Sequence, residues 1–131
     1  DAYLAVSGLP LAEEKHAENI LKAAIEIRDF ILRRRKELGD KTFEVRIGIH
    51  SGSVVAGIVG VKKFAYEIWG DTVNTAARME QNSEAGRINI SQTTYELLMR
   101  ATVQDRDTFK FEYRGEIDAK NKGKLKMYFV N

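Results

Sequence analysis

A chain of 131 residues with 44% hydrophobic and 31% charged residues is long enough for one folded domain and too apolar to be disordered. Its 21 basic and 19 acidic residues leave a net charge of +2, which gives no reason to expect a nucleic acid or a membrane surface as partner. The chain has no cysteine and two histidines, which excludes disulfides and leaves carboxylates, the ligands that suit Mg²⁺, to hold any metal.

No apolar run is long enough to cross a membrane, and no signal peptide is visible. The chain begins with Asp1 rather than with methionine. We therefore expect residues 1–131 to be a single domain whose N-terminal part is absent. We also expect a cytoplasmic location, with any membrane contact made by segments outside this chain.

The first half of the chain predicts a strand, a long helix and a hairpin. The apolar run 2–6 is typical of a buried strand, and apolar residues at steps of three and four predict a helix over 13–38. Residues 43–49 alternate and 54–59 form a second apolar run, so we expect these two to pair as a β-hairpin. Glycines in this region suggest a bulge or close approach of another backbone. They are Gly48, Gly52, Gly57 and Gly60.

A short helix is predicted over 72–81, with Asp71 expected to help cap it. A strand follows at 87–90. Ser91 then begins a Ser-Gln-Thr-Thr run ahead of apolar residues, which predicts a capped helix through about residue 101.

The chain ends in two predicted strands, 109–117 and 124–130, joined by a turn. The predicted order of elements is β-α-β-β-α-β-α-β-β. Helices interleaved with an antiparallel-rich sheet indicate an α+β fold of the ferredoxin-like kind.

The predicted helix 72–81 carries a polar pair that suits a nucleotide. Asn74 and Arg78 are four positions apart, so they share one face near the start of the helix. An amide and a guanidinium that project together suit a sugar oxygen and a phosphate. On spacing alone, an ordinary polar helix surface is the better interpretation.

Four stretches in order along the chain resemble blocks of the class III adenylyl and guanylyl cyclase catalytic domain. They are 1–9 (DAYLAVSGL), 45–57 (VRIGIHSGSVVAG), 67–79 (EIWGDTVNTAARM) and 120–130 (KNKGKLKMYFV). Because four ordered blocks span the chain, the resemblance outweighs the interpretation of 72–81 as an ordinary surface helix.

The resemblance implies conversion of a nucleoside triphosphate to a 3′,5′-cyclic nucleotide and pyrophosphate, assisted by two Mg²⁺ or Mn²⁺ ions. It implies that Asp1 is a metal ligand, and that the first metal aspartate lies upstream. It also implies that Asn74 orients the ribose and that Arg78 stabilises charge developing on the phosphate. Lys120 falls at the family's lysine for the triphosphate.

Glu67 falls at the position where the family selects its base, usually Asp in adenylyl cyclases and Cys in guanylyl cyclases. A carboxylate accepts the adenine 6-amino hydrogen and would repel the guanine 6-oxo group. Glu67 is one methylene longer than Asp, but it favours ATP. We therefore expect an adenylyl cyclase that makes cyclic AMP.

The family forms its sites between two catalytic domains, one supplying the metals and the other the base, ribose and phosphate contacts. This chain holds residues of both kinds, Asp1 and the group around Arg78, so the resemblance implies a homodimer with two equivalent sites. Trp69 is expected in packing or at the dimer interface, and His50 in a structural role.

Two alternatives stay open. One is a guanylyl cyclase that makes cyclic GMP. The other is a non-catalytic cyclase-like domain that only dimerises or senses nucleotide. Degenerate copies usually lose the Asn, the Arg or a metal aspartate, whereas Asn74, Arg78 and Asp1 are all present.

Overall fold

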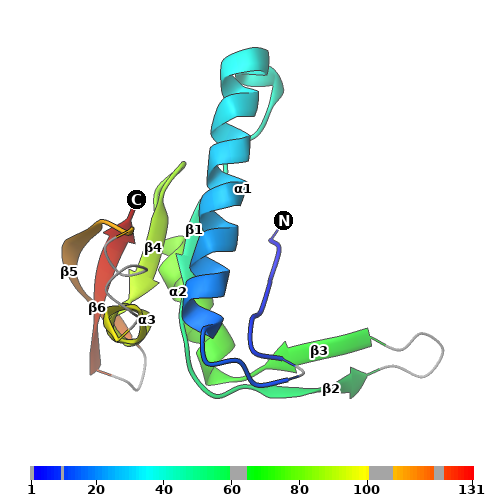
Figure 1. Cartoon of the computed structure of the whole chain (residues 1–131), viewed down its shortest axis with the longest axis vertical. Helices are drawn as coiled ribbons and strands as arrows, with labels where there is room; N and C mark the ends of the chain where they lie inside the picture. Colours follow the sequence, from blue (N-terminus) through cyan, green and yellow to red (C-terminus); the bar gives the residue numbers. More distant parts are fainter. Residues whose placement is uncertain (1, 10, 60–64, 101–107, 120–122) are drawn as a thin grey trace.

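A computed structural model describes residues 2–9, 11–59, 65–100, 108–119 and 123–131 of the chain. It contains helices, one short 3₁₀ turn and strands, and Figure 1 shows how the helices and strands are arranged. The elements are α1 (His16–Leu38), η1 (Gly39–Lys41), β1 (Ile47–Ile49), β2 (Val55–Val59), β3 (Ala65–Trp69), α2 (Asp71–Gln81), β4 (Ile88–Ser91), α3 (Gln92–Met99), β5 (Phe111–Ala119) and β6 (Gly123–Val130).

Four of the strands form a mixed sheet in the order β1-β4-β6-β5. β1 pairs with β4 in parallel, while β4 with β6 and β6 with β5 pair antiparallel. The sheet is therefore antiparallel-rich and combined with helices, which confirms the predicted α+β class.

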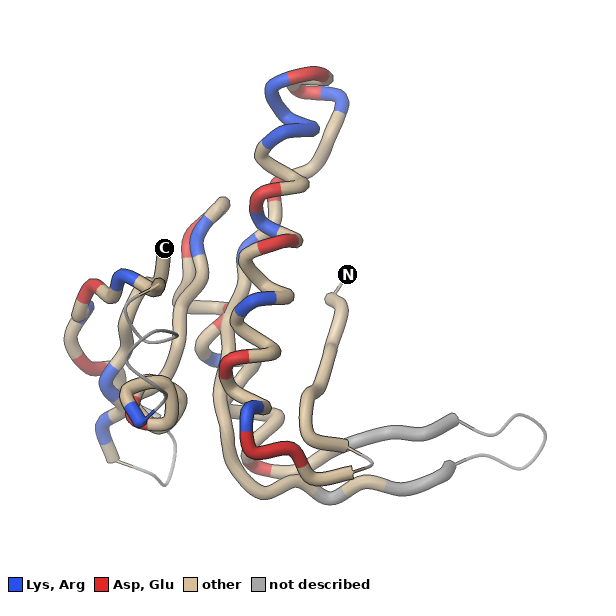
Figure 2. The backbone as a smooth tube through the Cα atoms, viewed as in Figure 1, with Lys and Arg blue, Asp and Glu red and all other residues tan. Residues whose placement is uncertain are grey.

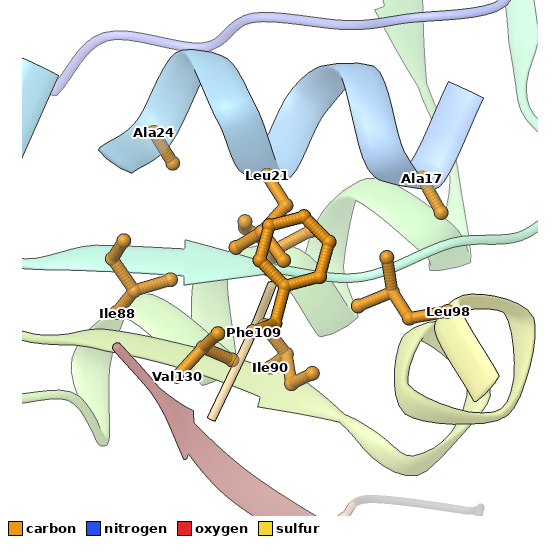
Figure 3. Packing of buried hydrophobic residues seen from close by; sticks show 9 residues of the cluster. Ala17, Leu21, Ala24, Ile88, Ile90, Leu98, Phe109 and Val130 are labelled. Carbon is orange, nitrogen blue, oxygen red and sulfur yellow. The ribbon is translucent and has the colours of Figure 1, made fainter. Parts of the chain in front are cut away.

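The core lies between this sheet and the helices α1 and α3. Alternate residues of a strand face opposite sides of a sheet, so Ile88 and Ile90 of β4 point to the same side. There they pack with Leu21 of α1, Leu98 of α3 and Val130 of β6, all fully buried (Figure 3). The residue between the two isoleucines, Asn89, faces the other side of the sheet, where α2 lies.

α1 begins three residues after the predicted start at 13 and ends at Leu38, close to the predicted end. Basic residues gather at its C-terminal end (Figure 2), where cations suit the helix dipole. Arg35 in this last turn also pairs with Glu44, with 3.1 Å between the guanidinium and the carboxylate. In the part of the chain that the structure describes, no helix is long and apolar enough to cross a membrane.

The predicted strand at 2–6 is wrong: these residues form neither helix nor strand. Tyr3 is 90% exposed and Leu4 is 54% exposed. An apolar run forms a buried strand only where a neighbouring strand takes its hydrogen bonds and a second layer covers it. No strand among the described residues does this for 2–6.

The predicted hairpin between 43–49 and 54–59 is also wrong. The first stretch contains only the three-residue strand β1, which pairs with β4, and the second, β2, pairs with β3 in a separate two-stranded sheet. Alternation indicates that a strand exists but not which strand is its neighbour. The strand β3 was not predicted from the sequence.

The other elements agree with the prediction to within about two residues. Ser91 caps α3 as expected, since its Oγ accepts a hydrogen bond from the Thr94 backbone N–H at 3.4 Å. α3 ends at Met99, and the predicted end at 101 lies outside the described residues. In β5, a register shift between Tyr113 and Gly115 marks a β-bulge.

Candidate active site

α2 is an amphipathic helix of 11 residues that presents the polar pair on one face. Thr75 and Met79, four residues apart, are buried against the sheet, with exposed fractions of 3% and 0%. Asn74 and Arg78 precede them and therefore lie together on the neighbouring face. This agrees with the shared face predicted for the pair.

The helix begins at Asp71, directly after Gly70, whose φ of +119° is a conformation that favours glycine. Gly70, which has no side chain, occupies the N-cap position, so Asp71, expected to help cap the helix, is its first helical residue rather than its N-cap. As the first helical residue, Asp71 places a carboxylate at the positive end of the helix dipole. The first helical hydrogen bond is donated by the Asn74 N–H to the Gly70 carbonyl at 3.1 Å.

Two glycines allow α2 to lie directly against the chain around β1. A methyl group in place of the Gly48 hydrogen would lie 1.9 Å from the Glu80 backbone nitrogen. At Gly52 it would lie 2.7 Å from Thr72 Oγ1, the hydroxyl that donates to the Ser53 carbonyl. The close backbone approach predicted from the glycines is confirmed at Gly48, whereas at Gly52 the close neighbour is a side chain.

Asn74 and Arg78 differ in their surroundings. Asn74 is exposed, whereas Arg78 is half-buried and its Nη2 donates to the Asp118 carbonyl of β5 at 2.5 Å. The Arg78 Nε is buried and has no hydrogen-bond partner among the described residues. The guanidinium therefore reaches the end of β5, two residues before Lys120 in the sequence.

The remaining predicted site residues are described only in part or not at all. The backbone of Glu67 lies in β3, opposite Gly57 of β2, in the strand that leads into α2. Asp1 and Lys120 lie outside the described residues. The structure thus brings Asn74 and Arg78 together and places Glu67 on the preceding element.

The whole chain, residues 1–131, matches the family described as the adenylate and guanylate cyclase catalytic domain. The chain belongs to this family.

Its relatives include cyclases of both specificities. A receptor-type guanylate cyclase of Caenorhabditis elegans, gcy-28, is 41% identical over 134 residues, which cover 99% of this chain and 10% of that protein. The crystal structure of the adenylyl cyclase CyaB from P. aeruginosa matches with a TM-score of 0.77 and 29% identity, covering 95% of this chain and 64% of that one.

A non-canonical dimeric guanylyl cyclase domain of the RhoGC fusion protein from the aquatic fungus Blastocladiella emersonii matches with a TM-score of 0.75 and 31% identity. The match covers 95% of this chain and 63% of that domain. The chain therefore spans less than two thirds of these solved cyclase domains and about a tenth of the receptor's length.

His50 of this cyclase domain lies in a polar network that supports a structural role. Its Nδ1 is 2.7 Å from Ser91 Oγ, and Ser51 Oγ is 2.9 Å from Thr94 Oγ1. These contacts join the end of β1 to the start of α3. Trp69, in contrast, is 45% exposed at the end of β3, so it is not packed inside the domain. Its expected alternative place, a dimer interface, stays a prediction.

Two side chains that we did not single out in the sequence hold the last turn of α2 in this cyclase domain. Asn89 Nδ2 donates to the Met79 carbonyl at 2.9 Å, and Arg114 Nη1 donates to the Asn82 carbonyl. Arg114 also stacks on Phe129, with its guanidinium carbon 3.8 Å from the ring centroid. An asparagine between two isoleucines of a buried strand was a signal for such a role, since buried polar groups need partners.

The expected metal site cannot be assembled from the described residues alone. Within them, no three His, Asp or Glu side chains lie close enough to hold an ion together. Two Mg²⁺ or Mn²⁺ ions therefore stay a proposal that depends on Asp1.

Proposed function

We propose that this domain converts ATP to 3′,5′-cyclic AMP and pyrophosphate. The observation that carries the cyclase reaction is the half-buried Arg78 guanidinium, held beside the end of β5 on the same helix as the exposed Asn74, in a chain of the cyclase family. The choice of ATP over GTP rests on the carboxylate of Glu67. In the reaction, the ribose 3′-oxygen loses its proton and attacks the α-phosphorus, while the bond from that phosphorus to the pyrophosphate oxygen breaks.

Each proposed nucleotide-binding residue has a defined task in this scheme. Negative charge grows on the oxygens of the α-phosphate and of the leaving pyrophosphate, and a fixed guanidinium such as Arg78 stabilises it. The Asn74 amide orients the ribose by hydrogen bonds to its oxygens. Lys120 binds the triphosphate. No covalent enzyme intermediate is needed, because the nucleophile belongs to the substrate.

We further propose that Asp1 contributes to the binding of two Mg²⁺ or Mn²⁺ ions. When bound, such ions lower the pKa of the ribose 3′-hydroxyl and neutralise charge on the triphosphate. Because the described residues offer no complete ligand set, we derive no step through these ions.

Purified full-length protein, supplied with ATP or GTP and with Mg²⁺ or Mn²⁺, tests this function by the yield of cyclic AMP and cyclic GMP. We expect cyclic AMP as the main product. Cyclic GMP as the main product would support the second candidate, a guanylyl cyclase, which the 41% identity to a guanylate cyclase favours. A folded protein that makes neither product would contradict an enzymatic role and support the non-catalytic alternative.

Changing Glu67 to glutamine is expected to lower the preference for ATP over GTP, measured as the ratio of kcat/KM values, by about tenfold. The carboxylate only accepts hydrogen bonds and repels the guanine 6-oxo group, whereas an amide rotates to donate to that group or to accept from the adenine amine. Glu116→Gln, at an exposed position of β5, is the matched control and should leave the ratio unchanged. An unchanged ratio in Glu67→Gln would show that Glu67 does not read the base.

We propose that two copies of the domain form the active sites between them. In support, this chain holds both a candidate metal ligand and candidate nucleotide-binding residues. One solved relative, a non-canonical dimeric guanylyl cyclase domain, supports dimerisation of such domains. Symmetric dimers of this kind contain two equivalent composite sites.

Mixing two inactive variants of the full-length protein tests the shared site. Asp1→Ala and Arg78→Ala should each be nearly inactive alone. After exchange of subunits in an equal mixture, half of the dimers contain one intact site, so activity should return to about a quarter of the wild-type value. Activity that stays at the level of the separate variants would contradict a site built from both copies.

A further inference from the structure

The last turn of α2 is tied to the four-stranded sheet by a buried amide. Asn89 lies in the middle of β4 and is 0% exposed. Its Nδ2 donates to the Met79 carbonyl of α2 at 2.9 Å and lies 3.3 Å from the sulfur of Met127 on β6. Asn89 therefore contacts the helix and two strands of the sheet at one point.

Among the hydrogen bonds at the end of α2, those from Asn89 and from Arg114, which donates to the Asn82 carbonyl just after the helix, have donors that belong to the sheet. The last four carbonyls of a helix have no partner within the helix. The Arg78 carbonyl accepts from Asn82 N and Nδ2 at 3.0 and 2.8 Å, and the Glu80 carbonyl accepts from the Ser83 N–H at 3.0 Å. Those donors follow directly in the chain, whereas Asn89 belongs to a strand of the sheet and fixes α2 relative to it.

Stability alone does not explain an asparagine at this position. The Asn89 Oδ1 is buried and has no hydrogen-bond partner among the described residues. The amide cannot be reversed, because the Met79 carbonyl only accepts hydrogen bonds and must face the Nδ2. A leucine of similar size would remove this unpaired oxygen and leave the Met79 carbonyl without its donor, so the two costs largely offset and stability does not favour asparagine.

The position of α2 determines where its face with Asn74 and Arg78 lies. A helix of 11 residues is marginal by itself, so its place in the domain depends on tertiary contacts. Arg78 directly precedes Met79, whose carbonyl Asn89 holds, and the Arg78 Nη2 reaches Asp118 on β5. A shift of the Met79 backbone would therefore move the guanidinium away from its place at the end of β5.

We propose that Asn89 is a positioning residue that sets the place of α2 and, through it, of the Arg78 guanidinium. This inference rests on the proposed function, since it needs Arg78 to act on the phosphate. Small displacements of a group that acts on the transition state lower the rate steeply. Asn89 thus contributes to catalysis without contacting the nucleotide.

The test is Asn89→Leu in the full-length protein. We expect kcat for cyclic AMP formation to fall about tenfold or more, with KM for ATP changed less than about twofold and the variant still folded in thermal unfolding. If Asn89→Leu does not fold, Asn89→Met takes its place, because a flexible thioether adapts to the neighbouring Met79 and Met127. A folded variant with wild-type kcat would overturn the proposal.

A double-mutant cycle separates positioning from a general structural role. If Asn89 acts through Arg78, the double variant should be as active as Arg78→Ala alone, because the group that Asn89 positions is already absent. A second, equal loss in the double variant would overturn the proposed route through Arg78. The matched control is Asn82→Ala, which removes the side-chain donor to the Arg78 carbonyl, keeps the backbone donor and should leave kcat within about twofold.

A failure of the proposed function would look different from a failure of this inference. If the wild-type protein makes no cyclic nucleotide, the proposed function has failed. Hydrogen exchange of the α2 amides then still reports whether Asn89 fixes the helix, since faster exchange in Asn89→Leu supports this and unchanged exchange refutes it. If the wild type is active while Asn89→Leu shows wild-type kcat and exchange, only the inference has failed.

Discussion

Replacing Arg78 by alanine is expected to lower kcat for cyclic AMP formation roughly 10²- to 10³-fold, the loss typical of removing a preorganised donor to a developing oxyanion. The guanidinium stabilises charge that is larger in the transition state than in bound ATP, so KM should change much less than kcat. Its described hydrogen bond goes to an exposed carbonyl of Asp118, which water can serve instead. We therefore expect the melting temperature to stay close to that of the wild type. Steady-state kinetics and thermal unfolding of the full-length protein measure both effects.

Arg46→Ala is the control for the loss of a positive charge near α2. Arg46 pairs with Glu80 of the helix, with 3.2 Å between its Nε and the carboxylate, and both side chains are more than a third exposed. Exposed pairs of this kind contribute little, so kcat should stay within about twofold. Equal losses in Arg46→Ala and Arg78→Ala would point to a general effect of charge and contradict a specific role for Arg78.

Gly48→Ala is expected to lower the free energy of unfolding of the domain by about 3 kcal/mol or more, at the upper end of the usual cost of overpacking. The added methyl would lie 1.9 Å from the Glu80 backbone nitrogen and 2.4 Å from its Cα. Backbone atoms cannot rotate away as a side-chain tip does, so α2 would have to move off β1. Because α2 carries Asn74 and Arg78, activity should fall together with stability. Urea unfolding and cyclase assays of the same preparation test both.

Gly39→Ala is the control for Gly48→Ala, because it replaces a glycine at a position where the added methyl meets no other atom. Gly39 has a φ of +57° and nothing within 4 Å of the position of an added methyl. Its ψ of −129° lies outside the left-handed helical region, so the change should cost only backbone strain, about 1–3 kcal/mol, with activity retained. A Gly48→Ala protein as stable as the wild type would show that α2 does not depend on this close contact.

Local sequence patterns were sufficient to predict the helices that have a clear apolar periodicity or a capping residue. The apolar residues of α2 recur with helical period, and a capping pattern that begins at Ser91 predicts the start of α3. Both helices therefore lie close to where we predicted them. The glycine at position 48 correctly indicated a close backbone contact but not its partner, Glu80.

Strand partners and side-chain contacts between distant segments were not predictable in this way. β2 pairs with β3 rather than with β1, a choice that depends on tertiary geometry and not on alternation. For the same reason, the sequence placed Asn74 and Arg78 on one helix face but gave no sign that Arg78 reaches Asp118, 40 positions away. No role was predicted for Asn89, because a single polar residue in an apolar strand indicates that it has a partner but not which one.

The separate β2–β3 sheet has a consequence for how such a domain can diverge. Figure 1 shows this ribbon extending away from the four-stranded sheet, and among the described strands β2 and β3 pair only with each other. Glu67, the residue that we expect to read the base, lies on this ribbon, whereas Arg78 lies on a helix anchored to the sheet. A gene copy can therefore accumulate substitutions around position 67 and acquire a new substrate while the core and the phosphate chemistry stay under unchanged selection.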